Sequence, residues 1–247
     1  MFEATIRADR LADAVDAAGA LVEECRVRLG PDGASIRAAD PAVVAMVEVE
    51  VDADDFESYA ADGEVIGVDL TRLEDLVRVS DGDDLVRLRL DAERRVLVVE
   101  SGTLSYTLGL IDPETVREEP DLPELSPPAE ATLSGAQLDR GVAAADMVAD
   151  HLRLRVPESR ESLRIEAEGD TDDVTVELGP EKLIDFSPGE ADSLYSLDYL
   201  KEMTRPIPSD ASVTVEMGTE FLVRLAYEAA EAGPRVSYRL APRISTT

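Results

Sequence analysis

The chain has 247 residues, of which 44% are hydrophobic, and its 54 acidic against 24 basic side chains give a formal net charge of −30. This length is enough for two domains, and the many alternating Val, Leu and Ile residues exclude a disordered acidic chain, which could not bury a core. No run approaches the roughly 18 apolar residues of a membrane-spanning helix, and the first residues, MFEATIRADRL, lack the apolar segment of a signal peptide, so we expect a cytoplasmic protein with no membrane partner.

The acidic residues are spread along the chain and are not gathered in one tail. In a compact protein they repel one another at low ionic strength, whereas at molar salt the Debye length falls to about 3 Å and the repulsion is screened. The composition therefore predicts a folded protein of a salt-rich cytoplasm. The alternative is a protein that binds cationic partners.

The first half of the sequence predicts two helices among several strands, because apolar side chains recur every three or four residues in two segments and every second residue in others. In chain order we expect a strand over 2–7, a helix over 9–22, strands over 26–29, 35–38 and 43–51, a helix from Thr71, and strands over 85–90, 95–100 and 105–111. Asp9 is the predicted N-cap of the first helix, and TRLE, in which Glu74 reaches back to Thr71, is the predicted capping box of the second.

The second half repeats this order of elements. Sliding the chain along itself so that Leu11 falls on Leu138 also places Val15 on Val142, and a slip of two positions then places Leu88 on Val213. The predicted elements are helices over 136–148 and 198–204 and strands near 152–156, 162–167, 173–178, 212–217, 221–227 and 235–240. We predict an α+β fold of two similar domains, 1–117 and 131–247, joined by a linker over 118–130, each with two helices packed on antiparallel sheets. The alternative is a chance agreement between two segments rich in Leu and Val.

Two of the predicted strands, over 105–111 and 173–178, lie where the few helices cannot cover them. An open strand edge presents unpaired N–H and C=O groups that can pair with another chain. One such edge in each half allows a head-to-tail contact between copies, which closes into a ring if the rotation permits.

The linker contains PDLPELSPPAE at residues 120–130, with four prolines and two large apolar side chains, Leu122 and Leu125. A proline-rich segment is stiff and extended, so it holds a position without a core of its own. The two leucines either form part of a binding surface or merely pin the linker to the domain beneath it.

Motifs of catalysis and of cofactor binding are missing from the sequence. The single histidine, His151, has no Cys or His near it in sequence, so we expect no metal site, and no nucleotide-binding or nucleophile motif occurs, so we expect no cofactor. The single cysteine, Cys25, cannot form an internal disulfide and is a predicted buried hydrophobe. A salt-adapted, two-domain acidic hydrolase with a carboxylate pair is the alternative function.

Four segments together resemble one family: MFEA at the start, GASIRAADPAVVAMVEVEV, DLPEL at mid-chain and LAPRI near the end. The chain resembles the sliding clamps of archaea and eukaryotes, the proliferating cell nuclear antigen family, and within it a salt-adapted member. The resemblance implies a homotrimeric ring that surrounds duplex DNA without sequence preference. It also implies a processivity factor and not an enzyme, with polymerase, flap endonuclease, ligase and clamp loader as partners that bind through short motifs. A subunit of a heterotrimeric clamp is a close alternative.

The resemblance also implies three sets of site residues. The pocket for partner motifs is expected to comprise Ala39, Val44, Met46, Leu122, Pro123, Leu125, Leu222, Ala241, Pro242 and Ile244. The subunit contact is expected to comprise Tyr106, Thr107, Leu108, Leu110, Val174, Val176 and Leu178. The DNA-facing cations are expected to be Arg10, Arg72, Arg78, Arg140, Lys201 and Arg205.

The acidic helix faces depart from the family pattern. Asp13 and Asp75 stand where the resemblance leads us to expect lysine, and a carboxylate at these positions cannot pair with a phosphate. Our hypothesis is that hydrated cations fill the space between these acids and the phosphates. The alternative for each of the six basic residues is an ordinary solvated helix face.

Overall fold

The computed structural model describes residues 1–118, 126–159, 161–229 and 233–243. The chain divides into two compact units, Met1–Pro120 with Ala229–Val236, and Asp121–Glu228 with Ser237–Thr247. This division assigns residues 229–236 to the first unit, so the boundaries 1–117, 118–130 and 131–247 stay a prediction. Leu122, Pro123, Leu125 and Ile244 lie outside the described residues.

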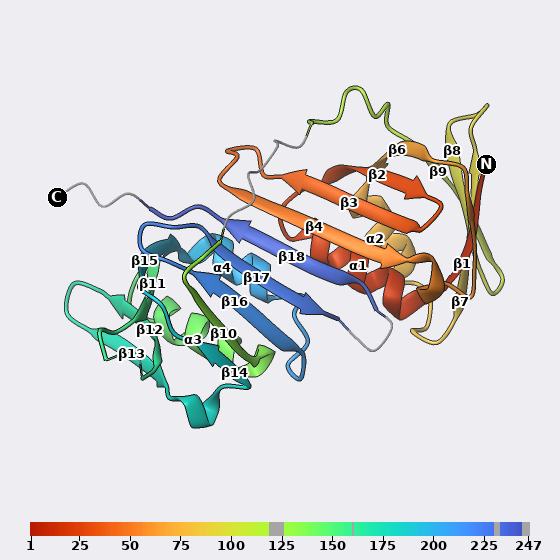
Figure 1. Ribbon diagram of the computed structural model, residues 1–247. Helices are drawn as coiled ribbons and strands as arrows, with labels where there is room; N and C mark the ends of the chain where they lie inside the picture. The colour runs from red at the N-terminus through yellow and green to blue at the C-terminus, as the bar shows by residue number, and fades with distance from the viewer. Residues whose placement is uncertain (119–125, 160, 230–232, 244–247) are drawn as a thin grey trace. The chain divides into compact units, whose positions relative to one another are not determined.

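The first unit combines two helices with two antiparallel groups of strands (Figure 1). Strands β5, β1, β7, β8 and β9 form one sheet in that order, and β4, β3, β2 and β6 are neighbours in the other. The elements are β1 (Phe2–Arg7), α1 (Ala8–Gly19), β2 (Glu24–Gly30), β3 (Gly33–Ala39), β4 (Ala45–Asp52), a 3-10 turn (Ala53–Asp55), β5 (Ser58–Ala61), β6 (Glu64–Asp69), α2 (Leu70–Val77), β7 (Leu85–Asp91), β8 (Val96–Ser101) and β9 (Leu104–Gly109).

The second unit has the same plan. Strands β13, β12, β11 and β15 form one sheet in that order, and β14, β10, β16, β17 and β18 are neighbours in the other. The elements are β10 (Ala129–Ser134), α3 (Gly135–Asp146), β11 (His151–Val156), β12 (Leu163–Glu168), β13 (Asp173–Leu178), a 3-10 turn (Pro180–Lys182), β14 (Asp185–Ser187), β15 (Ala191–Ser196), α4 (Leu197–Thr204), β16 (Ser212–Met217), β17 (Val223–Glu228) and β18 (Arg235–Leu240).

The duplication predicted from the sequence is confirmed, and the shift that relates Leu11 to Leu138 extends to the boundaries of the elements. The same shift carries Phe2, where β1 begins, onto Ala129, where β10 begins, and it also relates the starts of α1 and α3, of α2 and α4, and of β8 and β17. The slip that placed Leu88 on Val213 was wrong. Leu88 pairs with Ala4, and the counterpart of Ala4, Ala131, pairs with Val215. The two halves thus stay in register through β7 and β16.

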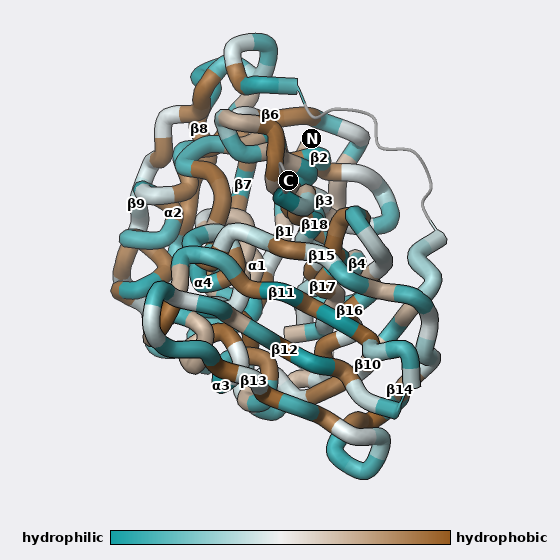
Figure 2. Tube along the Cα trace, turned by 90° about the vertical axis from the view of Figure 1, so that its left-hand side faces the viewer, coloured by the Kyte–Doolittle hydropathy of each residue, from teal (hydrophilic) through white to brown (hydrophobic). Residues whose placement is uncertain are grey.

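The core of each unit is built from alternating strand residues and one face of each helix. In β4, Val47, Val49 and Val51 are buried as their alternation predicted, and Leu11 and Val15 are buried on α1. Helix α1 packs against α2 and β4, and α3 against α4 and β12. Figure 2 shows the strands changing repeatedly between hydrophilic and hydrophobic residues along their length. None of the helices within the described residues combines the length and the hydropathy needed to cross a membrane.

The helix starts differ from the predicted caps. Helix α1 begins at Ala8, so Asp9 lies inside the first turn, where its carboxylate accepts bonds from Arg7 and from the Arg10 backbone N–H. Helix α2 is capped by Asp69, whose side chain accepts a 3.0 Å bond from the Arg72 N–H. The capping box at Thr71 was therefore wrong, because the helix starts one residue earlier and Glu74 pairs with Arg78 instead.

Candidate functional site

Two strands lie at the ends of their sheets. β9 is the last strand after β8, and β13 is the last strand before β12. Among the described residues no strand pairs with the outer edge of either one. The two open edges predicted at 105–111 and 173–178 therefore exist, and the first ends at Gly109.

The predicted contact residues are not equally accessible on these edges. Tyr106 is 40% exposed, Thr107 is exposed, and Val174 and Val176 are half-buried. Leu108 is fully buried and Leu178 is 6% exposed, so both side chains belong to the core of their own unit.

Leu110 lies beyond the end of β9 in the first unit. Its N–H donates a 3.0 Å bond to the Arg95 carbonyl, and its side chain is half-buried. That donor is thus already used within the same chain.

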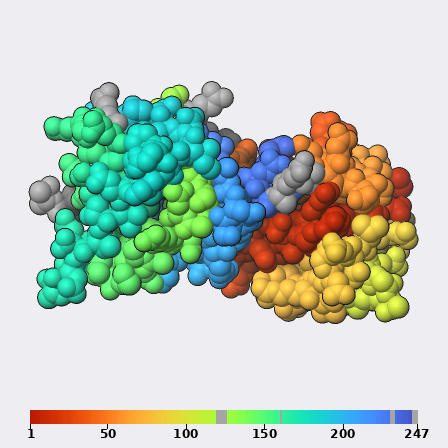
Figure 3. Space-filling view, turned by 90° about the horizontal axis from the view of Figure 1, so that it is seen from below, coloured from red at the N-terminus to blue at the C-terminus, as the bar shows by residue number. Residues whose placement is uncertain are grey.

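The outer faces of the four helices carry the predicted DNA-facing cations. α1 and α2 pack together, and Figure 3 shows them side by side on one face of the first unit, in red and in golden yellow. Five of the six cations have partners within the chain. Arg10 donates to the Asp55 carbonyl at 2.7 Å, and ion pairs join Arg72 to Asp69, Arg78 to Glu74, Lys201 to Asp146 and Arg205 to Glu202.

Arg140 differs from the other five. It is exposed on α3, and it has no ion-pair or hydrogen-bond partner among the residues that the structure describes. The neighbouring Asp139 is also exposed. The helix faces therefore offer little uncompensated positive charge.

Asp13 adds unfavourable negative charge to α1. Partial burial, and then the carboxylates of Asp9 and Asp16, raise the pKa of Asp13 to about 6. The three acids are spaced four and three residues apart, which places them on one face of the helix. A cation close to this face would relieve their repulsion.

The first-unit residues of the predicted partner pocket lie in the loop between β3 and β4 and in the strand residues beside it. Ala39 and Met46 are buried at its two ends, and Val44 is 37% exposed. The buried carboxylate of Asp40 accepts bonds of 2.8 Å from the backbone N–H groups of Ala42, Val44 and Ala45.

Val43, at the tip of this loop, was not identified from the sequence. Its φ is 58°, which is rare for a β-branched residue, and its side chain is 51% exposed. The hydrogen bonds to Asp40 fix the loop on both sides of Val43 and so stabilise its strained backbone conformation. Strain of this kind cannot be seen in an isolated Ala-Val-Val sequence.

The second-unit members of the predicted partner pocket lie near the ends of β17 and β18. Leu222 and Pro242 are half-buried, and Ala241 is exposed. The following Arg243 N–H donates a 2.7 Å bond to the Leu194 carbonyl on β15. This bond holds the segment after β18 against its own unit.

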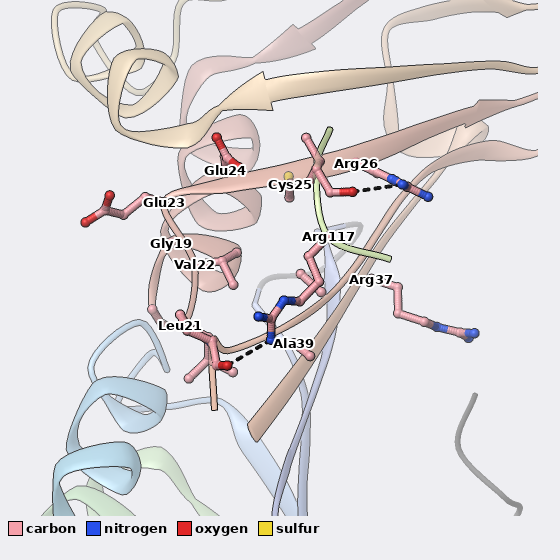
Figure 4. Close-up of a pocket in the computed structure, with 14 residues that line it drawn as sticks. Gly19, Leu21, Val22, Glu23, Glu24, Cys25, Arg26, Arg37, Ala39 and Arg117 are labelled. Atoms are coloured by element: carbon pink, nitrogen blue, oxygen red, sulfur yellow. Dashed lines mark hydrogen bonds between the residues drawn. The ribbon is translucent and has the colours of Figure 1, made fainter. Parts of the chain in front are cut away.

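The first unit contains a cavity of about 610 Å³ beside the end of α1 (Figure 4). Leu21, Val22 and Ala39 contribute apolar surface to it, and two glutamates and three arginines contribute charge. The complete lining is Gly19, Ala20, Leu21, Val22, Glu23, Glu24, Cys25, Arg26, Arg37, Ala38, Ala39, Pro41, Val116 and Arg117.

Cys25 and His151 are the two residues that the sequence singled out for possible metal or thiol chemistry. Cys25 is fully buried, as predicted, and burial, together with Glu24, raises the pKa of its thiol to about 12. His151 begins β11. Within the described ranges, no three His, Cys, Asp or Glu side chains are grouped so that they could hold a metal ion.

Comparison with known proteins gives the chain its family. The model for "Proliferating cell nuclear antigen, N-terminal domain" matches residues 1–106. Over 246 residues, with both chains covered in full, the sequence is 53% identical to the DNA polymerase sliding clamp of Natronomonas pharaonis and 50% identical to that of Haloarcula marismortui. The chain belongs to the proliferating cell nuclear antigen family of DNA polymerase sliding clamps.

The fold of this sliding-clamp chain agrees with the same conclusion. It matches A. fulgidus PCNA, in a structure of the C-terminal region of FEN-1 bound to that protein, with a TM-score of 0.94, 38% identity and full coverage of both chains. The family resemblance inferred from MFEA, DLPEL and LAPRI is thereby confirmed, as is the α+β fold of two similar domains.

For a sliding clamp, the structure adds residues that sequence reasoning missed. Asp40 and Val43 shape the loop that holds Val44, and Arg26, Arg37 and Arg117 meet at one cavity although they are far apart in sequence. The clue to Asp40 was its position directly before a proline in a turn. No local pattern could have grouped the three arginines.

Proposed function

We propose that three copies of the chain form a closed ring around duplex DNA and tether replication and repair enzymes to it, without catalysing a reaction. The observation that supports this most is the full-length similarity, at 53% identity, to a protein described as a DNA polymerase sliding clamp. Acting on DNA places the protein inside the cell, and the salt-rich cytoplasm inferred from its charge remains part of the proposal.

The ring would form through the two open strand edges. β9 of one copy would pair with β13 of the next, with Tyr106 and Thr107 facing Val174 and Val176. Such a contact uses different surfaces on the two copies, and it closes when the rotation between copies divides a full turn. Pairing would satisfy the backbone groups that each edge leaves open.

DNA would be held by topology and only weakly by charge. Each direct phosphate contact strengthens binding through counterion release, but this term shrinks as salt rises, with a slope of about −0.9 per contact. Five of the six cations already have partners in the chain, and Asp13 and Asp75 add negative charge to the same helices. Hydrated cations between these acids and the phosphates would then line the ring.

Partner enzymes would bind through short motifs, in the manner of the C-terminal region of FEN-1, which is bound to the related clamp of A. fulgidus. The pocket is the one expected from the resemblance. Ala39, Val44 and Met46 provide its first-unit residues, and the remaining members are Leu122, Pro123, Leu125, Leu222, Ala241, Pro242 and Ile244. An apolar socket of this kind captures a helical turn with its aromatic anchors.

The decisive experiment compares two linear DNAs at molar salt after loading by the clamp loader. Retention is expected on DNA whose ends are blocked and loss is expected from the same DNA with free ends, because a ring slides off an open end. Equal retention on both would show direct binding and contradict topological tethering.

Sedimentation at molar salt separates the alternatives. A mass about three times 26.7 kDa for the chain alone supports the homotrimer. Assembly only after mixing with other clamp chains would instead support a heterotrimer, and a monomer with hydrolytic turnover would support the acidic hydrolase.

Replacing Leu125 or Val44 by Glu is expected to abolish capture of a partner-motif peptide, because a charge would enter an apolar socket, while leaving the sedimenting mass unchanged. Peptide binding measured by fluorescence anisotropy checks this. Normal binding by both variants would mean that the pocket is misplaced.

A further inference from the structure

The arginines at the cavity of Figure 4 are unusual in this chain, which has more than twice as many acidic as basic residues. Arg26 comes from β2, Arg37 from β3 and Arg117 from the segment after β9. Arg117 lies across the middle of the cavity, with Arg26 and Arg37 toward one side and Glu23 toward the other.

Arg37 forms an ion pair with Glu48, and the other two guanidinium groups have N–H donors that are not used within the described residues. Arg26 donates to the Val116 carbonyl at 2.8 Å and to Glu118 at 3.3 Å, but its Nε is buried with no hydrogen-bond partner among the described residues. Arg117 uses one nitrogen, Nη1, to reach the carbonyls of Pro41 and Asp40. A guanidinium has five N–H donors in a fixed fork, so both groups can accept a further anionic partner.

The second unit provides an internal comparison. Residues 19–24 line the first cavity, and their counterparts in the repeat, residues 146–151, line a cavity of the same volume, about 610 Å³, in the second unit. The second cavity has no arginine or lysine in its lining. Its charged residues are Asp146, Asp150, Glu168, Asp170 and Asp172, together with His151. The second unit also has arginine at the positions equivalent to Arg26 and Arg37, but these residues, Arg153 and Arg164, pair with Asp192 and Glu177 and do not line its cavity. Arginines line the cavity only in the first of these two equivalent places.

We propose that the arginine-lined cavity of the first unit binds the carboxylates of an acidic peptide segment that flanks a partner's clamp-binding motif. This rests on the proposed tethering function. Ala39 belongs both to this cavity and to the predicted partner pocket, so a peptide seated in the pocket lies within reach of the cavity. A volume of about 610 Å³ lies in the range of roughly 300–1,000 Å³ that is typical of ligand sites.

An acidic peptide fits the lining better than a nucleic acid does. The guanidinium fork pairs with a carboxylate through two parallel bonds, and Leu21, Val22 and Ala39 offer apolar contact to peptide side chains. The proposed DNA-facing residues of this unit lie on α1 and α2, and none of them lines the cavity.

The test uses two synthetic peptides that share one clamp-binding motif. One carries three glutamates beside the motif and the other carries three glutamines at the same positions. Their dissociation constants are measured for the assembled wild-type protein and for Arg37→Gln and Arg117→Gln. Arg94→Gln is the matched control, because Arg94 is an exposed arginine of the same unit that does not line the cavity.

Wild type and Arg94→Gln are expected to bind the glutamate peptide about three- to tenfold more tightly than the glutamine peptide, as charge-assisted contacts at a partly exposed site allow. In Arg37→Gln and Arg117→Gln this ratio is expected to fall toward one while the affinity for the glutamine peptide stays the same. If the arginines had only a structural role, the substitutions would lower the affinity for both peptides equally.

Two results would overturn the proposal: equal affinity of wild type for the two peptides, or displacement of the glutamate peptide by a duplex oligonucleotide at equimolar concentration. Failure of the motif itself to bind either version would instead count against the proposed tethering function, so the two failures are distinguishable.

Discussion

At the scale of single residues, the chain balances repulsion on its helix faces with short-range pairing. Most of the basic side chains expected to face DNA are joined to a carboxylate one turn away or on the neighbouring helix, as in Arg205 with Glu202 and Lys201 with Asp146. Each exposed pair of this kind contributes little to the free energy of unfolding, about 0–1 kcal/mol. The pairing also reduces the positive electrostatic potential that an unpaired cation would produce at the helix surface. Asp13 has no ion-pair partner in the described part of the chain, and its pKa is raised.

Asp13→Asn is expected to stabilise the protein at pH 8. Because the pKa of Asp13 is raised to about 6 from an ordinary value of 3.8, ionisation of this side chain destabilises the folded state above pH 6, and this cost disappears as the pH falls through 6 toward 3.8. After allowance for partial exposure and salt screening, we expect a gain of about 1 kcal/mol at pH 8 and almost none at pH 4.

Denaturant unfolding of Asp13→Asn and wild type at both pH values measures this difference. Other titrating groups are common to the two proteins and cancel in the comparison. If the stability advantage of Asp13→Asn over wild type grew as the pH fell, the pKa of Asp13 would not be raised in the folded protein.

At the scale of elements, the two copies of the fold use different local chemistry to begin equivalent helices. α3 starts with a capping box, in which Ser134 accepts a bond from the Gln137 N–H and Gln137 accepts one from the Ser134 N–H. Its counterpart α1 starts after Arg7 with no side-chain cap. α4 starts after Ser196, whose side chain also makes no cap bond.

Ser134→Ala is therefore expected to cost about 1 kcal/mol of unfolding free energy, the usual value of an N-cap bond. Ser196→Ala is the matched control and is expected to change it by less than about 0.3 kcal/mol, because no cap bond is lost. Denaturant midpoints in high salt give both numbers. Equal losses of unfolding free energy in Ser134→Ala and Ser196→Ala would show that the capping box of α3 does not stabilise the protein.

At the scale of the whole molecule, a net charge of −30 opposes association of copies unless salt screens it. Strand pairing at β9 and β13 must outweigh that repulsion for a ring to persist. The side chain of Leu108 is unsuitable for testing this, because it is buried and a charge there would unfold the unit. Tyr106 is suitable, since it is 40% exposed on the open edge.

Tyr106→Asp is expected to yield folded monomers at molar salt, because it places a new charge in the middle of the proposed contact. Val65→Asp is the control, since Val65 is 44% exposed but lies on β6, which is not one of the two strands of the proposed contact. Sedimentation across a salt series, with circular dichroism to verify folding, distinguishes the two. Unchanged assembly of Tyr106→Asp would place the contact elsewhere.

The sequence by itself determined the features that depend on short-range periodicity. The alternation of Val47, Val49 and Val51 and the apolar face of α1 were visible locally, and so were the repeat of the two halves and the two open edges. Five strands, β5, β6, β10, β14 and β15, were not among the predicted elements. β6 contains Gly67, against which the Ile111 backbone packs, and β15 buries Ser193, whose hydroxyl donates to the Gly218 carbonyl.

The tertiary structure alone decided which distant side chains meet. It joined Arg10 to the Asp55 carbonyl, brought Arg26, Arg37 and Arg117 to one cavity, and used the Asp40 carboxylate to hold Val43 at a positive φ. Periodicity specifies which face of an element is buried, because that depends on the spacing of residues along one strand or helix. Hydrogen bonds and ion pairs between elements depend on ångström-scale distances across the fold, and those distances exist only once the elements have packed.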